Sequence, residues 1–287
     1  MLVFIHPLPH IISRHLGVSR LIAVPSDLQQ VIDDAWEVTK TIPGYLLENE
    51  AKFLGVLAAL TPADGVIVEI GSYRGRSTVM LAKVASHYGL RPVVAVDPHN
   101  SPILIKPGAP KTTSYDDFLE SLRIANIADH VEPHLAYSTD VSATWNRPVR
   151  LLWIDGDHSY AGAKADLDGF LPHVAPYGVI ALHDALSNFA GPIRIFVEDM
   201  LRSDNFGPAG FVHSIAWAQS RPADGAKFRA QRARLAQRAA KLAARVEDGV
   251  ELHGWKKMRF KLTRSRIPRF PLSYEAWAKQ LDPRATP

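Results

Sequence analysis

The sequence feature that most constrains the fold is a short apolar run followed by a glycine turn and the start of a helix. The β-branched run Val66–Ile70 predicts a buried strand, and Gly71 and Gly75 follow it. Apolar residues at helical spacing then occupy 78–84. Glycines let the backbone approach a ligand closely, and the free N–H groups of a first helical turn point toward it. The segment therefore predicts a binding site for a ligand with polar or charged groups.

The side chains of this segment restrict the kind of ligand. Glu69 would place a carboxylate against the phosphates of a dinucleotide, so it disfavours a pyrophosphate and favours a ligand with an ammonium group. The glycine spacing is Gly-x-x-x-Gly, whereas NAD sites carry Gly-x-Gly-x-x-Gly. A zwitterionic ligand is expected, and a dehydrogenase is the least favoured class.

Strands and helices alternate through the first 220 residues. Further strands are expected at 92–96, 131–135, 149–154 and 179–182, with a last edge strand at 211–218. Helices are expected at 25–40, 48–60, 115–126, 161–171 and 191–201, a loop at 100–113 and a turn at 174–178. This alternation predicts an α/β protein with a Rossmann-like doubly wound, mostly parallel sheet and helices on both faces.

Acidic residues accompany four of these strands, at the ends where binding groups collect in a parallel sheet. They are Glu69, Asp97, Asp155 and Asp184. Asp97 follows Gly71 by 26 positions, near the offset at which α/β nucleotide sites place a carboxylate on ribose hydroxyls. One such acid alone is explained as a solvated strand-end residue, but four together predict a ligand site.

The last two strands of this set deliver residues suited to catalysis. Asp155 and Asp184, with His183 adjacent, could bind one divalent cation: carboxylates favour Mg²⁺, and an imidazole shifts the preference toward Mn²⁺. His158 follows Asp155 by three residues and could take a proton from a hydroxyl that the metal polarises. The structural alternatives are an aspartate that caps the next helix and histidines that pack through hydrogen bonds.

The motifs around these residues resemble a known family. VEIGSYRGRS (68–77) is similar to the first motif of class I S-adenosylmethionine-dependent methyltransferases, in the form found in metal-dependent O-methyltransferases related to catechol O-methyltransferase. WIDGDHSY (153–160), with GVIALHD (178–184), more closely resembles the branch that includes macrolide sugar O-methyltransferases and cephalosporin-biosynthesis hydroxylation/methylation proteins. The resemblance covers residues 45–200 and excludes the C-terminal tail.

This resemblance implies how the cofactor would be held. Glu69 would bind the ammonium of S-adenosylmethionine, Asp97 would bind the ribose, and Ser138 would lie near the adenine. The amino-acid end of the cofactor would be shaped by Gly71, Tyr73, Gly75 and Ser77.

The resemblance also implies catalytic roles. Asp155 and Asp184 match metal ligands, and His158 matches the base, which is a lysine in the catechol enzymes. His183 stands where relatives carry an acidic metal ligand, so it changes the metal preference, weakens the site or marks a protein without metal.

The function expected from these motifs is S-adenosylmethionine-dependent methyl transfer to a hydroxyl of a small molecule or sugar. His158 would act as general base beside Asp155, with help from Mg²⁺ or Mn²⁺. The alternatives are a metal-independent or nitrogen-directed methyltransferase of the same fold, and an inactive binding protein that acts through its basic tail.

Charge divides the chain of 287 residues into two parts. Residues 221–287 hold 17 Lys/Arg against 6 Asp/Glu, whereas the preceding 220 hold 16 against 23. We expect an N-terminal extension or cap at 1–44, a cofactor-binding domain at 45–220 and a basic helical extension at 221–287. No signal peptide is expected in the apolar but proline-broken N-terminus, and a cytoplasmic location is assumed by default.

The basic extension admits three interpretations. Residues 226–246 predict a helix with a narrow apolar seam of Phe228, Leu235 and Leu242. It could pack on the domain or form a homo-oligomer, lie on an anionic membrane surface, or bind nucleic acid. Packing is the favoured interpretation, and a partly ordered arm is expected over 251–287.

Overall fold

The computed structural model describes residues 23–100, 114–270 and 273–287. The first half of the predicted N-terminal extension and the predicted loop at 100–113 lie outside these residues, except for Asn100.

The described residues form a seven-stranded sheet in the order β3-β2-β1-β4-β5-β7-β6, in which β7 alone is antiparallel to its neighbours. The strands are β1 Val66–Ile70, β2 Val93–Val96, β3 Val131–His134, β4 Val149–Ile154, β5 Val174–Leu182, β6 Phe206–Val212 and β7 Ile215–Ser220. Strand order reverses between β1 and β4, which are hydrogen-bonded neighbours. The predicted Rossmann-like, mostly parallel α/β sheet is confirmed.

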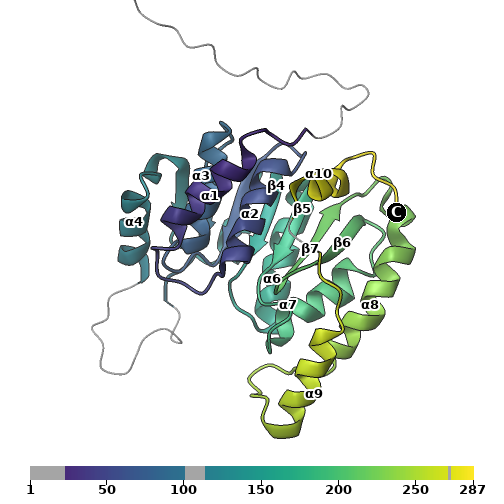
Figure 1. Cartoon of the computed structure of the whole chain (residues 1–287). Coiled ribbons are helices and arrows are strands. Elements are labelled where there is room, and N and C mark those ends of the chain that lie inside the picture. Colours follow the sequence, from purple (N-terminus) through teal and green to yellow (C-terminus); the bar gives the residue numbers. More distant parts are fainter. Residues whose placement is uncertain (1–22, 101–113, 271–272) are drawn as a thin grey trace, which may run out of the picture.

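Helices cover both faces of this sheet (Figure 1). The first face packs against α1 Leu28–Thr39, α2 Glu48–Leu60, α3 Arg76–His87 and α10 Tyr274–Leu281, with α4 Ser114–Ile124 beside α3. The second packs against α6 Tyr160–Phe170, α7 Ala190–Ile195 with the π-helical turn η4 Phe196–Met200, and α8 Arg229–Ala243. The remaining helices are α5 Ser138–Ser142 and α9 Gly254–Ser265, with short 3₁₀ turns at Ala128–His130, Leu171–His173 and Gly225–Phe228.

The central strand shows why an unbroken apolar run was needed. All five residues of β1 are buried. Ile67 joins the core on the face of α1, α2 and α3, whereas Val66, Val68 and Ile70 join the core on the face of α6 and α7. Because side chains alternate between the faces of a strand, a strand covered on both faces cannot alternate polar and apolar residues.

Two predicted segments differ from the structure near the end of the sheet. The single strand expected at 211–218 is a hairpin, because the chain turns at His213 and Ser214 between β6 and β7. His213 adopts a left-handed conformation (φ 50°), which glycine or asparagine normally supplies, so the usual turn signal is missing. The turn expected at 174–178 is the first half of β5.

The C-terminal segment is folded onto the domain. Leu235, Ala239 and Leu242 of α8 are buried in the core on the α6 face, as expected for a packing helix. The partly ordered arm predicted at 251–287 is wrong, since this segment contains α9 and α10. In α10, the ring centroid of Trp277 lies 4.7 Å from that of Phe53 in α2. The division at 44 and 220 and the oligomeric state stay predictions.

No helix in the described residues has both the length and the apolar character needed to cross a membrane.

Candidate active site

Apart from Ser138, which follows β3, the predicted site residues gather at the carboxyl ends of β1, β2, β4 and β5, where the strand order reverses. Ligands of open α/β sheets bind at this position. Two backbone hydrogen bonds join the loops that leave these strands: Asp155 N donates to Ile70 O at 2.8 Å, and Gly71 N donates to Val96 O at 2.9 Å. The fold therefore fixes the ends of three strands against one another before any ligand binds.

The two glycines of the central loop are required by the backbone. Gly71 (φ 87°) and Gly75 (φ 86°) are both left-handed. A Cβ on Gly71 would lie 2.2 Å from the carbonyl oxygen of Asp155, and one on Gly75 would lie 3.1 Å from the Phe118 ring. Gly71 thus allows β1 and β4 to approach at their ends, and Gly75 leads directly into α3 at Arg76.

Glu69 is fully buried and lies inside β1, one residue before its end. Its Oε2 accepts a hydrogen bond from the hydroxyl of Thr78 in α3. Its Oε1 and the nearby Ser72 Oγ are buried and have no hydrogen-bond partner among the described residues. Burial raises the pKa of Glu69 to about 7, although the nearby hydroxyls of Ser77, Thr78 and Ser72 lower it. An unpaired buried acceptor is costly, so this pair of oxygens fits a ligand that donates hydrogen bonds.

Asp97 follows β2 and organises the backbone around it. Its Oδ2 accepts from Tyr73 N at 2.8 Å, and its Oδ1 accepts from His99 N at 2.6 Å. Tyr73 is left-handed (φ 47°) and its ring stacks on Tyr45 with centroids 6.2 Å apart. Each carboxylate oxygen keeps a lone pair after accepting one hydrogen bond, so Asp97 can still accept from hydroxyl groups.

Ser138 is the first residue of α5 and pairs with an acid that the sequence analysis missed. Its hydroxyl donates a hydrogen bond to Oδ1 of Asp166 in α6. Burial raises the pKa of Asp166 to about 6, although this hydrogen bond lowers it. Asp166 lies on the buried face of α6 with Ala163 and Leu167, and an acid on an apolar face was the available signal.

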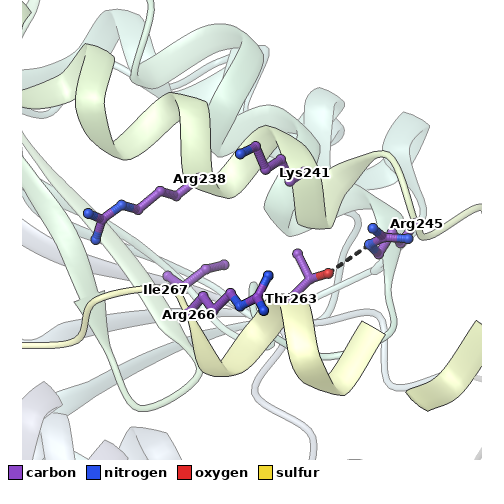
Figure 2. Close-up of a pocket in the computed structure, with 6 residues that line it drawn as sticks. All are labelled: Arg238, Lys241, Arg245, Thr263, Arg266 and Ile267. Carbon is purple, nitrogen blue, oxygen red and sulfur yellow. Dashed lines mark hydrogen bonds between the residues drawn. The ribbon is translucent and has the colours of Figure 1, made fainter. Parts of the chain in front are cut away.

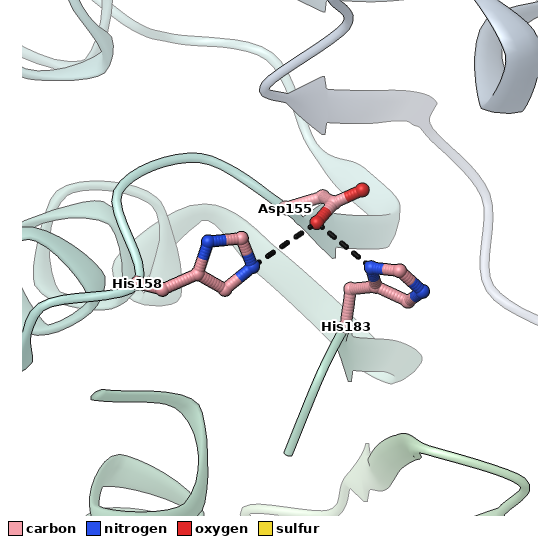
Figure 3. Close-up of side chains that lie close together, drawn as sticks. All are labelled: Asp155, His158 and His183. Atoms are coloured by element: carbon pink, nitrogen blue, oxygen red, sulfur yellow. Dashed lines mark hydrogen bonds and ion pairs between the residues drawn. The ribbon is translucent and has the colours of Figure 1, made fainter. Parts of the chain in front are cut away.

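Asp155 lies between two histidines (Figure 3). Its Oδ1 is 2.9 Å from Nδ1 of His183 and 3.3 Å from Nε2 of His158. The His158 approach lacks hydrogen-bond geometry, so its buried Nε2 has no hydrogen-bond partner within the described chain. The His158 ring stacks on Phe189 with centroids 4.6 Å apart. Asp184, in a left-handed conformation (φ 53°), places Oδ2 3.8 Å from both of those imidazole nitrogens.

Glu50 is a further member of this cluster that the sequence analysis missed. Only 2% of its surface is exposed, and its Oε2 lies 3.4 Å from Nε2 of His183. Its Oε1 lies 2.8 Å from Nδ1 of His213 and accepts from the hydroxyl of Ser214. Helix α2 thus contacts both β5 and the β6–β7 turn. In the sequence, Glu50 continues the apolar face of Leu54, an unusual place for an acid.

The charges of the cluster depend on one another. Burial lowers the pKa of His183, but Asp155 and Glu50 on its two sides raise it well above its usual value. Asp155 also raises the pKa of His158, against the effect of burial. Burial raises the pKa of both carboxyls, but His183 and His158 lower that of Asp155 to about 2, and His183 holds that of Glu50 well below its usual range. Asp155 and Glu50 are therefore ionised at neutral pH, and His183 is cationic when no metal is bound.

The cluster contains three atoms that could ligate one metal ion. Carboxylate and imidazole atoms of Asp155, His158 and His183 all lie within 4.8 Å of one another. The predicted set was Asp155, His183 and Asp184; His158 joins the first two in this group, and Oδ2 of Asp184 lies 3.8 Å from both imidazole nitrogens. Because Nε2 of His183 faces Glu50, its Nδ1 is the nitrogen that points to Asp155 and to the metal position.

Residues 68–185 match a family described as a methyltransferase domain. The chain contains a methyltransferase domain. The matched range includes the central loop, Asp97, Asp155, His158 and the His183–Asp184 pair, and it excludes Glu50 and the C-terminal helices. The predicted resemblance to class I methyltransferases and the prediction of a methyltransferase are both confirmed.

Solved structures of similar fold agree with this assignment. Cofactor-bound Rv0187 from MTB is 21% identical, with a TM-score of 0.51 over 67% of this chain and 90% of that one. The O-methyltransferase NovP is 14% identical, with a TM-score of 0.51 over 68% of this chain and 98% of that one. At these identities the likeness supports the fold of the methyltransferase domain. The roles of individual residues stay predictions.

Proposed function

We propose that this protein is an S-adenosylmethionine-dependent O-methyltransferase that acts on a hydroxyl of a small molecule or sugar. The observation that carries the proposal is the position of Nε2 of His158, which makes no hydrogen bond to the described residues and lies 3.3 Å from Asp155 and 3.8 Å from Asp184. A histidine nitrogen without a hydrogen-bond partner, held near a carboxylate, is suited to accept a proton from an alcohol.

In this proposal the cofactor is held by residues of β1, β2 and α5. Glu69, with its free Oε1, accepts from the ammonium group, and Asp97 accepts from the ribose hydroxyls. Ser138 lies near the adenine, and the amino-acid end is shaped by Gly71, Tyr73, Gly75 and Ser77. S-adenosylmethionine supplies an electrophilic methyl group on a sulfonium. The unpaired buried oxygens of Glu69 and Ser72 support a cationic ligand at this end.

His158 acts as the general base. It would receive the hydroxyl proton at Nε2 as the methyl carbon leaves the sulfonium sulfur for the acceptor oxygen, with S-adenosylhomocysteine as the leaving thioether, and Asp155 would stabilise the imidazolium that results. The Phe189 ring stacked on His158 limits the positions that the imidazole can take. The base is available only when it is deprotonated, and since Asp155 raises its pKa, proton transfer requires a higher pH than it would with an unperturbed histidine.

The residues of the cluster also fit a divalent metal. With Nε2 of His158 kept for the proton, Asp155 and Nδ1 of His183 would be the ligands, and a set that includes an imidazole favours Mn²⁺ or another transition ion over Mg²⁺. Glu50 would accept the Nε2 proton of His183, the arrangement that commonly orients a metal-binding histidine. Such an ion would polarise the acceptor hydroxyl.

One observation favours a second candidate, a metal-independent methyltransferase. Both ring nitrogens of His183 face carboxylates, at 2.9 Å from Asp155 and 3.4 Å from Glu50. A doubly paired imidazolium would place a fixed positive charge where the metal would otherwise sit. The two candidates differ in whether a proton or a metal ion occupies Nδ1 of His183.

The test is methyl transfer from S-adenosylmethionine to a panel of sugars and catechols, with and without Mn²⁺, by wild type and His158→Asn. We expect the variant to lose about 10² to 10⁴ of the rate and to bind S-adenosylhomocysteine as wild type does. His253→Asn is the matched control, because His253 is an exposed histidine that pairs with Glu251 and not with the cluster. Full activity of His158→Asn would refute the role of His158 as the general base. Activity that survives chelators would select the metal-independent candidate.

A further inference from the structure

The exposed face of α9 carries a stripe of large apolar side chains. Trp255, Met258 and Leu262 are 68%, 54% and 54% exposed. At 3.6 residues per turn they lie within about 60° of one another around the helix. Isolated apolar side chains on a surface are normal, but three large ones in a row on one helix mark an interaction surface.

The opposite face of the same helix holds it on the domain. Phe260 is 5% exposed and belongs to the core on the α8 side of the sheet. Ile267, just after α9, is 3% exposed and belongs to the same core. In Figure 1, α9 lies at the lower end of α8, at the periphery of the molecule. The helix is therefore anchored through Phe260, and the stripe faces away from that anchor.

The surroundings of the stripe are basic. Helices α8 and α9 contain no acidic residue. Their basic residues are Arg229, Arg232, Arg234, Arg238 and Lys241 in α8, and Lys256, Lys257, Arg259, Lys261 and Arg264 in α9. By helical spacing, Arg259 and Lys261 border the stripe on its two sides. The acids of this region, Glu247, Asp248 and Glu251, are confined to the connection between the helices.

A basic groove lies between the two helices (Figure 2). It has a volume of about 470 Å³ and is lined by Arg238, Lys241, Arg245 and Arg266, with Thr263 and Ile267. No carboxylate lines it, and among the described residues Arg238, Lys241 and Arg266 have no ion-pair partner. Nε of Arg245 donates to Thr263 Oγ1 at 2.8 Å, which ties the two walls together. Four cations around one groove fit a phosphate group.

We propose that α8 and α9 form a docking surface for an anionic lipid bilayer. The stripe of Trp255, Met258 and Leu262 enters the headgroup region, and the groove binds lipid phosphates. A basic helix with an exposed Trp, Met and Leu face has the composition of helices that lie in a membrane interface. Clustered Lys and Arg add attraction to anionic lipids.

Nucleic acid explains this surface less well. Phosphates of DNA or RNA would pair with the cations, but the aliphatic side chains of Met258 and Leu262 would remain in water. Proteins that bind single strands stack successive bases on several aromatic rings, and this stripe offers Trp255 alone.

The connection between α8 and α9 contacts the start of α6, close in sequence to the candidate active site. Asp248 Oδ2 accepts a hydrogen bond from the backbone N–H of Tyr160 at 3.0 Å. Tyr160 begins α6 and follows His158 by two residues. The membrane proposal does not depend on the methyltransferase chemistry, and the two are tested separately.

The experiment is sedimentation of the full chain with vesicles of phosphatidylglycerol and phosphatidylcholine mixed in equal parts, or of phosphatidylcholine alone. We expect binding to the anionic vesicles, weakened by 0.5 M salt, and at least about tenfold weaker binding to neutral vesicles. Trp255→Ser with Leu262→Ser removes two of the three side chains of the stripe, and Arg238→Gln with Lys241→Gln neutralises two of the four cations of the groove. Each pair should lower binding about tenfold or more.

The matched control is Leu119→Ser with Ile124→Ser, two exposed apolar residues of α4 that are 41% and 56% exposed. This control should bind vesicles as wild type does. Unchanged S-adenosylhomocysteine affinity and melting temperature show that each variant is folded, whatever its lipid binding. Absence of vesicle binding, equal binding to neutral vesicles, or an unaffected stripe variant would overturn the proposal. So would binding to an RNA or DNA oligonucleotide without binding to vesicles.

Discussion

Replacing Glu69 by glutamine should stabilise the unliganded protein, and more so as the pH rises. The carboxyl is fully buried, and burial raises its pKa from 4.5 to about 7. Because the folded-state pKa lies above the unfolded value, the stability linked to the neutral acid is complete below pH 4.5 and is lost as the pH rises toward 7. A pKa difference of this size makes the ionised carboxyl cost about 3 kcal/mol at pH 8.5 and about 1 kcal/mol at pH 5.

Urea unfolding of wild type and Glu69→Gln at pH 5 and pH 8.5 measures this difference directly. The free energy of unfolding of Glu69→Gln should exceed that of wild type at both pH values. This difference should be about 2 kcal/mol larger at pH 8.5 than at pH 5. Thr78→Val is a control, because it removes the hydroxyl bonded to Glu69 and leaves the buried carboxyl in place. Because the Thr78 hydroxyl lowers the pKa of Glu69, the stability of Thr78→Val relative to wild type should fall as the pH rises, opposite to the trend for Glu69→Gln. If the free energies of unfolding of wild type and Glu69→Gln changed equally between pH 5 and pH 8.5, the argument that burial sets the charge of Glu69 would be refuted.

Three further outcomes follow from the site and its supports. Since Asp155 raises the pKa of His158, kcat/KM of the metal-free enzyme should increase with pH through a midpoint above 6.5. Asp155→Asn should lower that midpoint. A pH-independent kcat/KM would contradict the role of His158 as general base. Calorimetry with Mn²⁺ should show at least about tenfold weaker binding for Glu50→Gln and no change for His253→Ala, whereas equal affinities would remove Glu50 as the partner of His183. Arg150→Met should destabilise the fold by about 3 kcal/mol or more in urea unfolding, because the buried guanidinium donates to three backbone carbonyls; a loss under about 1 kcal/mol would refute that role.

The central part of the sheet could be predicted from local sequence. The runs at 66–70 and 149–154 are apolar without interruption, because both faces of these strands are covered by helices, and the structure places β1 and β4 at those bounds. Helix α2 was also predicted with the observed bounds. The acids near the ends of these strands were found for the same reason: a parallel sheet brings its carboxyl ends to one edge.

Contacts between distant parts of the chain could not be predicted. Glu50 is 133 residues from His183, and only the folded sheet places their side chains 3.4 Å apart. The hairpin at His213 lacks a glycine or asparagine, and its left-handed residue is held by the bond from the imidazole to Glu50. Helix α10 looked like part of a loose basic arm, yet Trp277 packs on Phe53 of a helix more than 200 positions earlier. Such contacts leave no periodic pattern in the sequence.

The most direct test of the proposed cofactor site is calorimetric titration of S-adenosylhomocysteine into wild type and Asp97→Asn, with Asp116→Asn as a matched control. Asp116 is an exposed acid in the first turn of α4. We predict micromolar binding to wild type and to the control, and at least about tenfold weaker binding to Asp97→Asn, because one acceptor of the ribose hydroxyls is weakened. Absence of binding to wild type, or equal binding to all three proteins, would contradict the assignment of this sheet edge as the cofactor site.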